Sequence, residues 1–170
     1  MVFLDETGAK TSMTRIYART RRGDRAVDYA PHGHWNTTTL IAAIMPEAVI
    51  APMVLNGPMD SLAFEAYVEH VLIPVLPPGS IVVMDNLSSH KHPSVAKLLS
   101  DSRSELWYLP PYSPDFNPIE NMWSKVKTFL RSAKARTQDE LYDAIATALA
   151  NITPEDTKGF FHNSVVGMIS

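Results

Sequence analysis

Hydrophobic residues in the first part of the chain fall in short, extended apolar stretches, which is the pattern of β-strands. A short strand is predicted for residues 1–5, and it reaches an acid almost at once. Two longer stretches, Thr37–Met45 and Val49–Leu55, are separated by a short turn with a proline and a glutamate. They predict a hairpin. The polar residues 10–30 predict a loop or a further hairpin.

From residue 60 onward, helical and extended patterns alternate along the chain. Asp60 is placed to cap a helix that runs to about Leu72. The continuous apolar run Ile81–Met84 predicts a buried parallel strand. Further helices are predicted for residues 92–100, 118–135 and 138–150, and another strand for residues 105–109. This order predicts an α/β fold, a mixed β-sheet with flanking α-helices.

The composition narrows the class of protein. The 170 residues, 45% of them hydrophobic and 19% charged, suit one globular domain with a core. The absence of cysteine excludes disulfides, zinc fingers and thiol catalysis. No apolar run reaches the roughly 20 residues that cross a bilayer. Two acids also stand where a signal peptide needs basic and apolar residues. We therefore expect a cytoplasmic protein without a membrane partner.

Positive charge is concentrated in two stretches, although the net charge of −3 argues on average against a nucleic-acid partner. Residues 10–25 hold six of the 15 Lys and Arg, and residues 125–136 hold five. By contrast, residues 137–156 hold five acids and no base. The two basic stretches favour local contact with a polyanion, and the alternative is an ordinary solvated surface.

Two acids stand at the ends of predicted core strands. Asp5 follows an apolar tripeptide, and Asp85 follows the run Ile81–Met84. A carboxylate in such a place is unfavourable unless it is paired, hydrogen-bonded or bound to a cation. The carboxyl ends of strands in α/β sheets are also where ligands bind. The alternative is that each acid caps the loop that follows it.

Glu120 has two interpretations. Asn117 is placed as an N-cap, Pro118 fits the first helical position, and Glu120 is then the third residue, which predicts a capping box. The alternative comes from the helix surface, where polar side chains share one ridge. These are Glu120, Ser124, Lys127, Arg131 and Lys134. A polyanion that lies along this ridge would meet a carboxylate at its end.

Three acids from separate elements can share two Mg²⁺ ions that clamp a phosphodiester.

Three segments resemble the catalytic motifs of DDE transposases of the mariner-like bacterial insertion-sequence group. They are Phe3–Gly8, Val83–Lys91 and Leu109–Lys127, the last with the string LPPYSPDFNPIENMWSKVK. The 34 residues between Asp85 and Glu120, residues 86–119, are similar to the spacing in that group. The resemblance covers residues 1 to about 150.

The resemblance implies a ribonuclease-H-like fold, with Asp5, Asp85 and Glu120 as catalytic metal ligands. The implied cofactor is Mg²⁺ or Mn²⁺, with two ions. The implied activity is DNA strand cleavage and strand transfer during cut-and-paste transposition of an insertion sequence. The implied partners are the element ends and the target DNA duplex.

Other polar residues are candidates for supporting roles. Contact with substrate or with the metal ligands is expected from Asn86, His90, Asn117 and Asn121. Contact with DNA is expected from Arg21, Arg22, Lys127, Arg131 and Lys134. Trp123 is expected to be a core residue because it lies in the apolar stripe of its helix. Asp115 is the nearest alternative to Glu120 as third ligand.

Full-length members of the group begin with helix-turn-helix DNA-binding regions, whereas Asp5 lies four residues from the start here. We therefore expect residues 1–170 to be a single catalytic domain without that region. A separately encoded N-terminal DNA-binding part and a homodimer are the partners that remain open, and the expected location is the nucleoid. Two alternative functions also remain: a catalytically silent truncated transposase that acts as a regulator, and a stand-alone metal-dependent nuclease.

Overall fold

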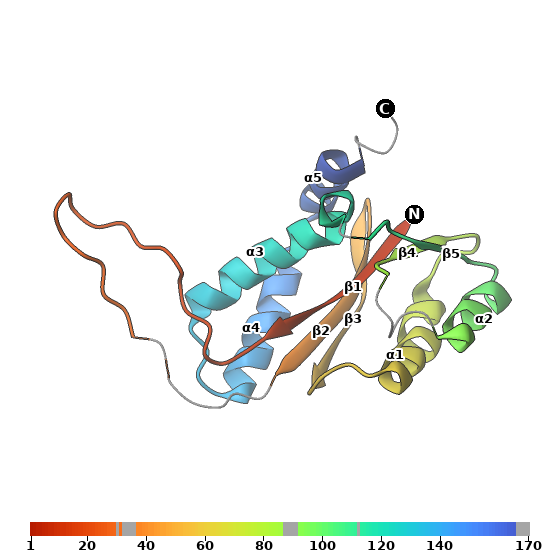
Figure 1. Ribbon diagram of the computed structural model, residues 1–170, viewed down its shortest axis with the longest axis horizontal. Coiled ribbons are helices and arrows are strands. Elements are labelled where there is room, and N and C mark those ends of the chain that lie inside the picture. Colours follow the sequence, from red (N-terminus) through yellow and green to blue (C-terminus); the bar gives the residue numbers. More distant parts are fainter. Residues whose placement is uncertain (30, 32–36, 87–91, 112, 166–170) are drawn as a thin grey trace.

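The computed structural model describes residues 1–29, 31, 37–86, 92–111 and 113–165 (Figure 1). Its centre is a five-stranded sheet in the order β3-β2-β1-β4-β5. The strands are β1 Val2–Ala9, β2 Thr38–Met45, β3 Ala48–Asn56, β4 Ile81–Met84 and β5 Glu105–Tyr108. β1 pairs antiparallel with β2 and parallel with β4. β2 and β3 form the predicted hairpin, and β5 extends the parallel half. The predicted mixed sheet is thus confirmed.

β1 is longer than its sequence pattern predicts. Its second half is partly polar, yet it continues to Ala9 because residues Glu6 to Ala9 pair with β2 over Ile41 to Thr38. The strand therefore carries Asp5 in its middle and not at its end.

Helices flank the sheet. They are α1 Ser61–Tyr67, α2 Pro93–Asp101, α3 Pro118–Ala133, α4 Gln138–Ala150 and α5 Pro154–Val165. The Asp60 carboxylate accepts a hydrogen bond from the Ala63 backbone N–H, so the predicted cap is present. Beyond α1 the chain continues as a π-helical segment, Val68–Leu72, and a 3₁₀ turn, Ile73–Val75. Within the described part of the chain, no helix is long and apolar enough to cross a membrane.

α5 was not expected from the sequence. Its few apolar residues give no continuous stripe, but its start is fixed by reciprocal hydrogen bonds between Thr153 and Asp156. Phe161 then packs edge-on against Phe3 of β1, with the two ring centroids 5.4 Å apart. α5 thereby covers the end of the sheet beside the start of α3.

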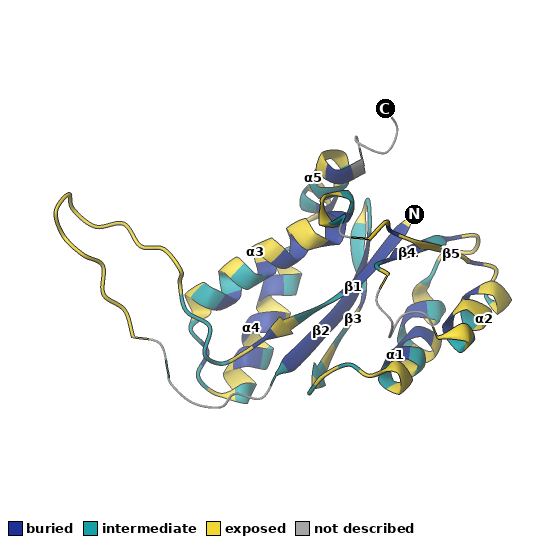
Figure 2. Cartoon of the chain, viewed as in Figure 1, coloured by how far each residue is buried: buried dark blue, intermediate teal, exposed yellow. Residues whose placement is uncertain are grey.

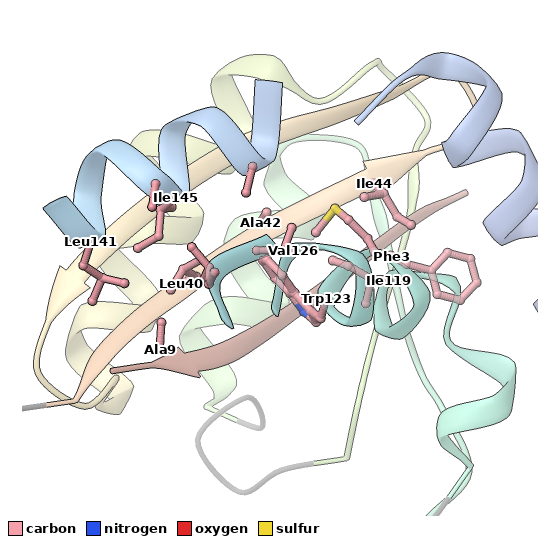
Figure 3. Packing of buried hydrophobic residues seen from close by; sticks show 14 of the residues in the cluster. Phe3, Ala9, Leu40, Ala42, Ile44, Ile119, Trp123, Val126, Leu141 and Ile145 are labelled. Atoms are coloured by element: carbon pink, nitrogen blue, oxygen red, sulfur yellow. The ribbon is translucent and has the colours of Figure 1, made fainter. Parts of the chain in front are cut away.

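Alternating side chains of the strands pack into two cores, one on each face of the sheet. Figure 2 shows that β2 is buried over most of its length, whereas the helices carry both buried and exposed residues. Phe3 faces the side covered by α3 and α4, whereas Leu4 faces the side covered by α1 and α2. On the first side, Ile119, Trp123 and Val126 of α3 pack over β1 and β2 (Figure 3). The apolar stripe predicted for this helix is therefore confirmed.

Residues 10–29 form a long loop that extends away from the sheet (Figure 1). The structure thus favours the loop over the alternative hairpin. One end of the loop is held by the Arg136 guanidinium, which donates to the carbonyl oxygens of Thr11 and Met13. Near its other end, Asp28 pairs with Lys134.

Candidate active site

A pocket of about 390 Å³ opens where β4 ends, beside the start of α3. All three predicted acids line it, each from a different element. The lining residues are Asp5, Asp85, Asn86, Leu109, Pro110, Pro111, Ser113, Pro114, Asn117 and Glu120. The proline-rich segment before α3 therefore forms one wall, and the strand residues form another.

Strand register brings the first two acids together. Leu4 of β1 lies opposite Met84 of β4 in the parallel pair, so Asp5 and Asp85 are the next residues along neighbouring strands. Asp5 is 8% exposed, and its Oδ2 accepts a hydrogen bond of 3.1 Å from the indole Nε1 of Trp123. This contact joins the first strand to α3 and holds the carboxylate in a fixed place.

Trp123 therefore has a second role besides packing. It is 1% exposed, as expected for a core residue, but its indole N–H reaches a predicted metal ligand. A buried tryptophan needs an acceptor for that N–H. Trp123 also lies three residues after Glu120, on the same side of the helix. The need of a buried indole for an acceptor, together with the three-residue spacing from Glu120, could have indicated this contact, but the sequence analysis did not predict it.

The capping box predicted at the start of α3 is wrong. Asn117 is the N-cap residue and Pro118 begins the helix, but Asn117 makes no side-chain cap bond. The two backbone N–H groups that a capping box would need already donate to backbone carbonyl oxygens. The Glu120 N–H donates to the Asn117 carbonyl oxygen at 3.1 Å, and the Asn117 N–H donates to that of Pro114 at 2.9 Å. The Glu120 side chain is exposed and lines the pocket.

The asparagines predicted near the site differ in placement. Asn86 is exposed and lines the pocket. Asn121 instead donates from Nδ2 to the Ser164 hydroxyl at 3.1 Å and lines a neighbouring pocket of about 530 Å³. Asp115 and Glu120 also line that second pocket. His90 lies outside the described residues.

The donor chemistry of the first pocket fits a hard divalent cation. Its polar side chains are carboxylates, amides and one hydroxyl, and oxygen ligands of this kind are what Mg²⁺ and Mn²⁺ prefer. Among the described residues, however, no three acidic or histidine side chains are close enough together to form one cation site. The three carboxylates thus share a pocket without forming a closed cage.

The basic residues divide into those that pair with an acid of the chain and those that have no ion pair among the described residues. Lys134 is not part of the helical ridge: α3 ends at Ala133, and Lys134 adopts a left-handed conformation with φ 53°. Its Nζ lies 2.6 Å from Asp28 Oδ2, and this hydrogen bond lowers the pKa of Asp28 below its ordinary value. Lys125 likewise pairs with Asp156 of α5.

Arg21 and Arg22 are exposed at a turn of the long loop, and Lys127 and Arg131 are partly exposed on α3. Within the described residues, none of these four side chains takes part in an ion pair. They are the predicted DNA-contacting residues that remain available to a partner.

Comparison with known proteins gives consistent results. Over residues 1–142, the chain matches the family model described as DDE superfamily endonuclease. It is 28% identical over 100 residues to the transposable element Tcb1 transposase of Caenorhabditis briggsae. That match covers 56% of this chain and 37% of the relative, so the chain matches well under half of that protein's length.

Solved structures show the same fold. The Mos1 strand transfer complex superposes with a TM-score of 0.76 at 19% identity, covering 95% of this chain and 50% of that chain. The catalytic domain of Mos1 mariner transposase gives a TM-score of 0.70 at 16% identity, covering 95% of this chain and 74% of that chain. The predicted ribonuclease-H-like fold is thus confirmed. Because the family model spans most of the chain, the protein belongs to the DDE superfamily of endonucleases.

Proposed function

We propose that this chain is the catalytic domain of a transposase that cleaves DNA strands and joins them to a target duplex during cut-and-paste transposition. One observation carries the proposal: three carboxylates from β1, the end of β4 and the start of α3 line one pocket. The family match and the likeness to the Tcb1 transposase support it.

Asp5, Asp85 and Glu120 would hold Mg²⁺ or Mn²⁺ here, with two ions shared between them. Bound cations of this kind polarise a phosphodiester and stabilise the charge that develops on its oxygens. Solved structures of the Mos1 catalytic domain include forms with Mn and with Mg. The chain's own part is positioning, since Trp123 fixes Asp5 while the exposed Glu120 side chain has room to adjust.

The DNA path we propose runs from the pocket along the outward side of α3. Lys127 and Arg131 follow Glu120 on this side, and their positive charges would contact phosphates without reading bases. Arg21 and Arg22 of the long loop would add phosphate contacts farther away. A separately encoded N-terminal part would recognise the element ends, and a homodimer would hold two ends together.

A nicking and strand-transfer assay tests the function. The DNA carries insertion-sequence ends, and a sequence-specific DNA-binding domain is fused to the chain so that delivery is not limiting. We expect Mg²⁺-dependent nicking followed by joining to a target duplex, both abolished in Asp85→Asn. Nicking without joining would favour a stand-alone nuclease. Binding without nicking would favour a silent regulator.

A further inference from the structure

Asn117 is an unusual polar residue of the candidate site. It is 4% exposed, and its Oδ1 is buried without a hydrogen-bond partner among the residues that the structure describes. An unsatisfied buried acceptor is destabilising, and folded proteins contain few of them. A ligand that donates a hydrogen bond would remove this penalty.

Local structure offers no hydrogen bond to this amide oxygen. An asparagine at an N-cap ordinarily accepts a hydrogen bond from a backbone N–H of the first turn. Here the N–H of Glu120, the third helical residue, already donates to the Asn117 backbone carbonyl, and the Asn117 side chain makes no cap bond to the first turn. At the start of α4 the same task is done by Thr137, whose hydroxyl accepts from the Glu140 N–H at 3.2 Å. The Asn117 side chain is therefore not held by its helix.

The surroundings of Asn117 indicate what could satisfy it. It lines the same pocket as Asp5, Asp85 and Glu120, whose carboxylates are themselves acceptors when ionised. A DNA phosphate is also an acceptor and would not pair with an amide oxygen. A hydrated divalent cation differs, because Mg²⁺ keeps several waters when bound by carboxylates, and those waters are donors.

We propose that Asn117 is a positioning residue for the divalent cation of this site, with its amide oxygen accepting a hydrogen bond from a water in the cation's hydration shell. The inference rests on the proposed function, because it assumes that the three carboxylates bind the cation. It goes further because it assigns Asn117 a role in cation binding, whereas the sequence pattern predicts a helix cap that the structure does not contain.

A metal titration without DNA tests the inference. Thermal melting of the whole chain is followed against Mn²⁺ concentration for the wild type and for Asn117→Ala. We expect the midpoint of the Mn²⁺-induced stabilisation to move to about tenfold higher concentration in Asn117→Ala, the loss typical of groups that hold metal ligands or their waters. The melting temperature without metal should stay within about 2 °C of wild type, because no cap bond is lost.

Thr137→Ala is the matched control, since it removes a real N-cap bond far from the pocket lining. It should lower the metal-free melting temperature and leave the Mn²⁺ midpoint unchanged. If Asn117→Ala behaves like Thr137→Ala, the residue is structural and the inference is overturned.

Two further variants separate the possible failures. If Asp85→Asn loses the Mn²⁺ response and Asn117→Ala keeps the wild-type midpoint, only the role of Asn117 fails. If the wild type does not respond to Mn²⁺, the proposed function and the inference fail together. If Asn117→Ala does not fold, Asn117→Asp decides. A carboxylate accepts such hydrogen bonds more strongly, so a midpoint at or below wild type supports the inference and a higher one overturns it.

Discussion

α3 and α4 lie side by side on one face of the sheet, and their sequences begin alike (Figure 1). α3 is preceded by Asn117 with Glu120 in its first turn, and α4 by Thr137 with Glu140 in its first turn. Both helices bury an apolar stripe in the same core (Figure 3). Their starts nevertheless differ in structure.

In α4 the capping box is complete. The Thr137 hydroxyl accepts from the Glu140 N–H, and the Glu140 carboxylate accepts from the N–H of Thr137 and of Arg136. In α3 the 3₁₀ turn Pro114–Phe116 leads directly into the helix, and backbone hydrogen bonds take the place of the box. The same local pattern thus stabilises the start of α4, whereas at the start of α3 it leaves the side chains of Asn117 and Glu120 in the pocket lining.

The two helices also differ in charge. Residues 137–156, which include α4, hold five acids and no base, whereas α3 carries the partly exposed cations Lys127 and Arg131. On the proposed function, α3 combines core packing with a DNA-binding surface, while α4 is structural. Four changes test that division.

Glu120→Gln should have the largest effect. Cleavage of DNA with element ends should fall by orders of magnitude, because a neutral amide is a poor ligand for a hard cation. The free energy of unfolding should change by less than about 1 kcal/mol, since no cap bond is lost. Nicking rates and urea unfolding measure the two quantities. Glu140→Gln, the equivalent change in α4, should cut at the wild-type rate. Near-normal cutting by Glu120→Gln would move the third ligand elsewhere, with Asp115 of the neighbouring pocket the first alternative.

Replacing Lys127 and Arg131 together with alanine should weaken DNA binding to about the same degree for all sequences. Phosphate contacts release counterions, so the slope of log affinity against log salt should flatten by about two. Fluorescence anisotropy over a salt series measures the slope. Lys134→Ala is the control, because its charge is already paired with Asp28. An unchanged slope in the double variant would make this side of α3 an ordinary solvated surface.

Trp123→Phe should separate the polar role of α3 from its packing role. The ring is retained in the core while the hydrogen bond to Asp5 Oδ2 is lost. We expect the free energy of unfolding to fall by about 1.5–3 kcal/mol, the range for hydrogen bonds to charged groups, together with weaker Mn²⁺ stabilisation. Urea unfolding with and without Mn²⁺ measures both. Equal loss in the two conditions would mean that the hydrogen bond stabilises the fold without positioning Asp5 for the cation.

The smallest expected effect is the pH dependence of the stability that the capping box of α4 contributes. Backbone hydrogen bonds from Arg136 and Thr137 hold the pKa of Glu140 below its ordinary value of 4.5. A group whose pKa is lowered in the folded state contributes stability at pH values above its ordinary pKa, and this contribution is lost as the pH falls through the folded-state pKa. The wild type should therefore melt slightly above Glu140→Gln at pH 7, and the two curves should converge toward pH 3. A gap that stays constant over this range would show that the charge of Glu140 contributes nothing.

Much of the architecture follows from sequence patterns, since local periodicity determines which side of an element is apolar. The β2–β3 hairpin, the buried strand before Asp85 and the stripe of α3 were all predicted. The length of β1 and the presence of α5 were not. Those elements depend on partners distant in sequence: β2 for the polar end of β1, and Phe3 for Phe161 of α5.

The candidate site divides in the same way. From the sequence alone, Asp5 and Asp85 are predicted as ligands because a carboxylate at the end of a core strand is unfavourable without a partner, and Glu120 because its motif resembles that of a known family. The structure brings all three into one pocket, and their role as ligands stays a prediction. Only the tertiary structure decided which hydrogen bonds form. It joined Trp123 to Asp5, paired Lys134 with Asp28, and left Asn117 without a cap bond. A side chain's partner depends on which groups the fold brings within about 3 Å and on which of those are already satisfied, and neither is determined by local sequence.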